Sequence, residues 1–102
     1  MTRYQLYINL LSANSRASEL ERTSARIKAV AADLQAKTAE TSANWQGAAS
    51  KEFAAKGRIL HAKLIKEAQS LQQTADTIRR IAKRTYETEL KALEMANQRV
   101  YH

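Results

Sequence analysis

Hydrophobic positions recur every three or four residues along almost the whole chain, in two long segments. In the first segment this step links twelve positions from Leu6 to Trp45, and none of the twelve is charged. A 3.5-residue repeat held over five heptads is typical of a helix that lies along a partner helix. Half of the twelve positions hold Ala, Ser or Thr, so the sequence predicts that the partner helix approaches closely.

The second segment shows the same step from Phe53 to Ala92, with Glu67 as the single charge in the stripe. We predict that this stripe faces the first helix and that four alanines flank it and widen the apolar face: Ala54, Ala68, Ala75 and Ala82. Beyond Arg84 the phase slips by one residue, and the apolar face continues through Tyr86, Leu90, Leu93 and Val100. Such a slip either unwinds the coiled coil locally or makes the last helical turns face a different neighbour.

Between the two segments lies Asn44-Trp45-Gln46-Gly47, with the only tryptophan and one of two glycines. Glycine permits a sharp turn, and tryptophan offers a large apolar surface that can join two helices. With no proline in the chain, we predict one all-α domain over residues 1–102: a helix over about 4–42, a corner over 43–48 and a helix over 49–98, forming an antiparallel hairpin. Thr2 is a candidate N-cap, and Gly57 is expected to admit a bulky side chain from the facing helix.

When two helices pair, each covers only the part of the other's apolar face that lies between them. The chain carries more large apolar residues than such a pair can bury, so we predict that dimerisation completes a four-helix bundle. The expected partner interface contains ten residues: Leu20, Ile27, Leu34, Leu60, Leu64, Leu71, Ile78, Ile81, Leu90 and Leu93.

No catalytic constellation is visible in the sequence. There is no cysteine, His61 and His102 stand alone, and Glu87 and Glu89 are two residues apart, so they do not face each other on a helix. We therefore expect no enzyme activity, no cofactor, no metal and no small-molecule substrate. Neither a signal peptide nor an apolar run of ~20 residues is present, so we expect a soluble protein.

The net charge of +7 is concentrated after residue 44, where eleven basic and six acidic side chains occur. Its densest part, here called the basic patch, is Arg79, Arg80, Lys83 and Arg84. An acidic protein partner or nucleic acid can neutralise such a cluster. Because no aromatic residue intersperses the patch and no DNA-binding motif accompanies it, we favour the protein partner; a small basic nucleic-acid-binding protein is the alternative, and a structural coiled-coil subunit a third.

Trp45, Gly47, Ala49 and Phe53 reproduce a W-x-G-x-A-x-x-x-F run at the start of the second helix, central in a chain of 102 residues. The chain thereby resembles the WXG superfamily, the ESAT-six-like substrates of type VII secretion. The resemblance implies a hairpin that dimerises into a four-helix bundle. It also implies a protein made in the cytoplasm and secreted folded, without a cleavable signal peptide, often with a related protein or the helical N-terminal region of a larger toxin.

The family commonly carries Y-x-x-x-[D/E] late in the second helix, which the secretion machinery reads. Here Tyr86 stands at the expected distance from Trp45, but Leu90 occupies the acidic position and the nearest acid is Glu89. Either Glu89 substitutes for that acid or a partner supplies the signal. This departure favours a heterodimer, with a homodimer as the other possibility.

Overall fold

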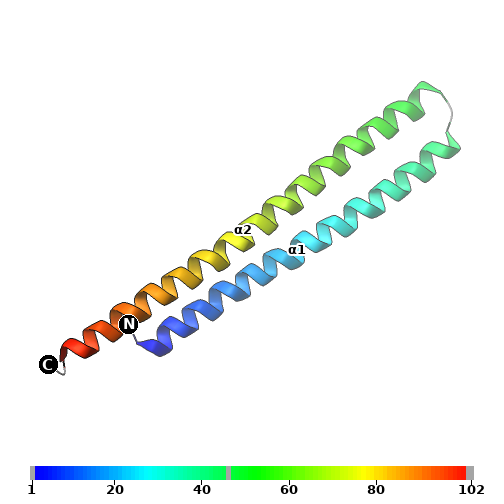
Figure 1. Cartoon of the computed structure of the whole chain (residues 1–102). Helices are drawn as coiled ribbons and strands as arrows, with labels where there is room; N and C mark the ends of the chain where they lie inside the picture. Colours follow the sequence, from blue (N-terminus) through cyan, green and yellow to red (C-terminus); the bar gives the residue numbers. More distant parts are fainter. Residues whose placement is uncertain (1, 46, 101–102) are drawn as a thin grey trace. The chain divides into compact units, whose positions relative to one another are not determined.

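The computed structural model describes residues 2–45 and 47–100, with side chains up to residue 98. These residues form helix α1, Arg3–Asn44, and helix α2, Ala48–Val100, and contain no strand (Figure 1). The all-α prediction is thus confirmed. The corner residue Gln46, His102 and the side chain of Val100 lie outside the described part.

Helix α1 begins with reciprocal hydrogen bonds between Thr2 and Gln5. The Gln5 amide donates to Thr2 Oγ1 at 3.1 Å, and the Thr2 amide donates to Gln5 Oε1 at 2.9 Å. Each side chain satisfies a backbone donor that has no partner within the first helical turn. Thr2 is therefore the N-cap, as predicted.

The corner between the helices is built around Gly47, whose φ is +99°. A Cβ at this position would meet nothing within 4 Å, so the left-handed backbone conformation alone favours glycine. The Ser42 carbonyl accepts hydrogen bonds from the Trp45 amide at 3.3 Å and from Ser50 Oγ at 3.1 Å. These bonds tie the last turn of α1 to the first turn of α2.

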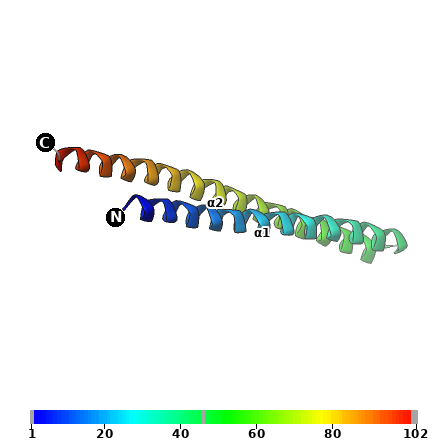
Figure 2. The ribbon, with the colours of Figure 1, turned by 90° about the horizontal axis from the view of Figure 1, so that it is seen from below.

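The chain folds as two compact units. The corner unit is Glu21–Gln72, and the terminal unit combines residues 1–20 with residues 73–102. In each unit an α1 segment lies antiparallel to an α2 segment, which confirms the hairpin pairing (Figures 1 and 2). The expectation of a single domain and the bundle formed by dimerisation remain predictions.

Small side chains form the core of the corner unit. Ala31 and Ala68 are fully buried, and Ser24 Oγ donates a 2.7 Å hydrogen bond across the seam to the Ala68 carbonyl. Along one edge of the seam, Gln72 Nε2 donates to Glu21 Oε2 at 3.1 Å. A side-chain hydroxyl reaches the backbone of the facing helix only when the two helices lie close together, as the small residues of α1 predicted.

The core of the terminal unit is equally light, with Leu6, Ala17 and Ala75 buried. At its edge the Arg79 guanidinium donates a 2.9 Å hydrogen bond to Ser18 Oγ. Helix α2 continues past the start of α1 in this unit, as Figure 2 shows from below.

The predicted stripe is right for α1 but only partly right for α2, where Gly57 faces α1 and several larger stripe residues do not. Eleven of the twelve α1 positions are buried or half-buried, and the twelfth, Trp45, is exposed. On α2 the alanines predicted as flanks lie in the seam, whereas Phe53, Leu60 and Ile81 are exposed. The reason is the close approach of the helices: the small α1 seam packs against the alanine side of α2, and larger side chains at that contact would force the backbones apart.

Candidate partner-binding surfaces

Large apolar residues line α2 on one side and stay in contact with solvent. Phe53, Leu60, Ile81 and Met95 are 39%, 47%, 56% and 49% exposed and are separated by multiples of seven residues. Half-buried leucine and isoleucine side chains lie beside this column. We call the whole set the α2 stripe: Phe53, Leu60, Leu64 and Leu71 in the corner unit, and Ile78, Ile81 and Met95 in the terminal unit.

Helix α1 contributes a matching column to the same side of the corner unit. Glu21 and Gln72 bond along one edge of the helix pair, so Ile27 and Leu34 of α1 share the other edge with the α2 stripe. Both are half-buried, and Val30 beside them is 58% exposed. In the terminal unit Leu20, at the same heptad position as Ile27, is half-buried. Each unit thus has an apolar side that a single chain leaves open.

Eight of the ten expected interface residues lie on this side, and their use as an interface stays a prediction. Leu90 and Leu93 are half-buried, but Leu93 follows Arg79 and Tyr86 at heptad spacing, on the edge where Arg79 bonds to Ser18. The phase slip beyond Arg84 accounts for their place. Val30 and Met95 are also exposed on this side and were not among the ten expected residues, although the seven-residue spacing from Ile81 through Thr88 points to Met95.

The Trp45–Phe53 pair joins the two helices at the corner. Their ring centroids lie 5.5 Å apart with the planes tilted by 50°, a geometry worth about 0.5–1.5 kcal/mol beyond the buried area. Trp45, which directly follows α1, thus contacts α2 as expected, and its role as part of the motif stays a prediction. Both rings nevertheless remain 50% and 39% exposed, and Gly47 and Ala49 are exposed as well. The motif therefore forms an accessible apolar surface at the corner.

Tyr86 and Glu89 line one groove of about 430 Å³ in the terminal unit. Leu6, Leu10 and Ile81 form its apolar wall. Tyr86 is half-buried, whereas Glu89 is exposed, so the phenol and the carboxylate are presented together to solvent. Their use as an export signal stays a prediction.

The basic patch is divided by the packing of the helices. Arg79 is half-buried and bonds to Ser18, while Arg80, Lys83 and Arg84 are exposed. The i,i+4 spacing places Arg80 next to Arg84 on the solvent side of α2. Three of the four cations are therefore available to a partner. Arg79 instead links α2 to α1 through its hydrogen bond to Ser18.

Other classes of site are not evident in the described residues. Within residues 2–45 and 47–100, no three His, Cys, Asp or Glu side chains gather in a way that could hold a metal ion. In the same part of the chain, no helix combines the length and apolar character needed to cross a membrane.

Comparison with known proteins agrees with the corner geometry. The family model described as proteins of 100 residues with WXG, WXG100, matches residues 13–90. Neither curated proteins nor solved structures give a significant match. The matched span holds the Trp45–Gly47 corner, Phe53 and the Tyr86–Glu89 groove residues, and it covers well over half of the sequence. A helical pair that turns at a Trp-x-Gly corner, over a family match of this extent, places the chain in the WXG100 family.

Proposed function

We propose that this protein is a small non-enzymatic substrate or secretion partner of a type VII secretion system, and that it acts by pairing with another helical protein in a four-helix bundle. The WXG100 family is associated with type VII secretion and with helical partners. Under this proposal the protein is made in the cytoplasm and secreted without a cleavable signal peptide.

The observation that carries the proposal is the open apolar side of each unit. Exposed apolar surface arranged with a seven-residue period matches the way one helix packs against another. Another WXG-like protein, or the helical N-terminal region of a secreted toxin, presents apolar helices of the kind that this side accommodates.

Charge favours a heterodimer over a homodimer. Two copies would bring together two chains of charge +7, and their repulsion is screened but not removed at physiological salt. An acidic partner relieves this repulsion and can pair with Arg80, Lys83 and Arg84, which are exposed. Such pairs contribute selectivity and association rate more than affinity.

Export is proposed to depend on two surfaces. The Trp45–Phe53 pair forms one, and the groove that holds Tyr86 and Glu89 forms the other. We expect Trp45→Ala to leave the protein expressed but poorly secreted or poorly paired. Tyr86→Ala should lower secretion if the groove carries the signal. Secretion of both variants at the wild-type level, with the native partner present, would contradict the export role.

Co-expression with the helical proteins encoded beside this one, followed by size-exclusion chromatography, tests the pairing. The expected result is a co-eluting heterodimer, which weakens when the three exposed residues of the basic patch, Arg80, Lys83 and Arg84, are changed to Glu. A well-folded monomer at micromolar concentration that finds no partner would refute the proposal. Tight, salt-sensitive binding to DNA in the absence of a protein partner would refute it as well.

A further inference from the structure

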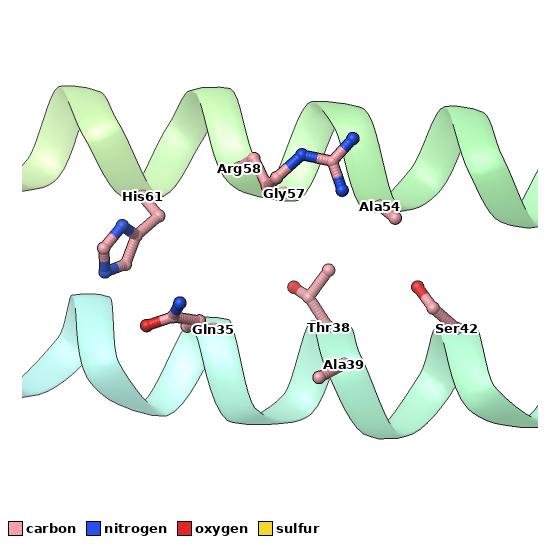
Figure 3. A pocket seen from close by; sticks show the side chains of 8 residues that line it. All are labelled: Gln35, Thr38, Ala39, Ser42, Ala54, Gly57, Arg58 and His61. Atoms are coloured by element: carbon pink, nitrogen blue, oxygen red, sulfur yellow. The ribbon is translucent and has the colours of Figure 1, made fainter.

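A second groove, of about 530 Å³, opens between the helices of the corner unit close to the turn (Figure 3). Its floor is made of the small residues Ala54 and Gly57 of α2. A Cβ on Gly57 would lie only 2.9 Å from Thr38 Oγ1 and 3.2 Å from Thr38 Cβ, so the helices meet closely below the groove. Gly57 thus admits a side chain from α1 as expected, but that side chain is the small Thr38 and not a bulky one.

Hydrogen-bond donors surround this floor. Gln35, Thr38 and Ser42 contribute an amide and two hydroxyls from α1, while Arg58 and His61 contribute a guanidinium and an imidazole from α2 (Figure 3). None of the lining residues is acidic. The groove is therefore rich in donors and carries positive charge without a carboxylate to balance it.

Two of these donors lack a partner of their own. The Ser42 hydroxyl oxygen is buried and has no hydrogen-bond partner among the described residues, although the Ser42 carbonyl accepts two bonds. A buried polar atom without a partner is uncommon and costs about 1–3 kcal/mol. Arg58 has only Ala54, Ala55, His61 and Ala62 at the neighbouring helical positions, so no acid on its own helix can pair with it.

Two of the five acidic side chains in the corner unit are engaged in ion pairs on their own helices. Asp33 pairs with Lys37 at 3.1 Å, and Glu52 pairs with Lys56 at 3.2 Å. The unit as a whole has nine basic and five acidic side chains. An anion that enters the groove thus meets a net positive surface.

We propose that this groove binds the carboxylate of an acidic peptide segment, with Arg58 as the principal contact. A carboxylate only accepts hydrogen bonds, and the planar guanidinium can bind both of its oxygens at once. Ser42, Gln35 and His61 offer further donors, and Ala39 and Ala54 leave room for the apolar part of neighbouring peptide residues.

The groove is distinct from the proposed bundle interface. Arg58 and Leu60 are two residues apart, so their side chains point about 160° apart around α2. A partner helix on the α2 stripe would leave the groove open. The acidic peptide is therefore expected to bind in addition to the bundle partner.

The test is an NMR titration of the whole chain with two blocked tripeptides, acetyl-Ala-Glu-Ala-amide and its Gln counterpart. We expect saturable shifts of the Gly57, Ser42 and His61 amide signals with the Glu peptide, at millimolar concentration, and weaker or absent shifts with the Gln peptide. Arg58→Gln should weaken binding about tenfold or more, because a charged hydrogen-bond partner is lost.

Arg26→Gln is the matched control, since it removes the same charge from an exposed position of the corner unit outside the groove. It should leave binding unchanged. Arg58→Lys keeps the charge but loses the planar guanidinium, so it should bind the Glu peptide with intermediate strength. Such a graded loss would show that the weaker binding of Arg58→Gln is not caused by misfolding. The proposal is overturned if the Glu and Gln peptides bind alike, if Arg26→Gln weakens binding as much as Arg58→Gln, or if acetate alone binds as tightly as the Glu peptide.

Discussion

Truncation of the α2 stripe should weaken pairing with the partner, while an equal truncation beside the stripe should not. Leu60 and Ile81 are 47% and 56% exposed in the single chain. Complete burial of such a side chain contributes about 1.5–3 kcal/mol, so covering the exposed half of each contributes about 0.7–1.5 kcal/mol. The double variant Leu60→Ala, Ile81→Ala should therefore lose about 1.5–3 kcal/mol of binding free energy, which corresponds to a roughly 10- to 150-fold higher Kd.

Ile59→Ala provides the control. Ile59 is 57% exposed, against 47% for Leu60 and 56% for Ile81, and lies outside the α2 stripe on the position next to Leu60. Because both truncations remove half-buried aliphatic groups, they should lower the stability of the folded chain alike. Only Leu60→Ala should raise the Kd measured by titration calorimetry with the co-purified partner. If Ile59→Ala weakens pairing as much as Leu60→Ala, the α2 stripe is not the interface.

Three substitutions test the local structure. Gly47→Ala should lower the free energy of unfolding by about 1–2 kcal/mol, since a Cβ is strained at a φ of +99°; an unchanged midpoint in urea would contradict the turn geometry. Gly57→Ala should destabilise the chain despite the better helix propensity of alanine, because its Cβ would collide with Thr38, and combination with Thr38→Ala should recover most of the loss. Ser42→Ala should raise the unfolding free energy by about 1 kcal/mol, because it removes a buried hydroxyl without a partner; a loss of stability would show that the hydroxyl is bonded in the free protein.

The binding surfaces could be predicted only in part. The Trp45–Gly47 corner and the leucines of the proposed interface follow from spacing, because their pattern is local to each helix. The donor groove could not be anticipated, since Ser42 and Arg58 come from different helices and line the same groove only in the folded chain, where Gly57 lets the backbones approach. No motif in the sequence predicts this groove.

The sequence by itself determined the two helices, the position of the turn and the buried side of α1. Each depends on local chemistry: helix-forming residues without proline, a glycine that accepts a positive φ, and a 3.5-residue repeat. Only the tertiary structure decided which side of α2 meets α1. The leucine and alanine columns of α2 are adjacent, and both are apolar. The close packing allowed by Ala31 and Ser24 selects the alanine column, which leaves Leu60 and Ile81 exposed to solvent.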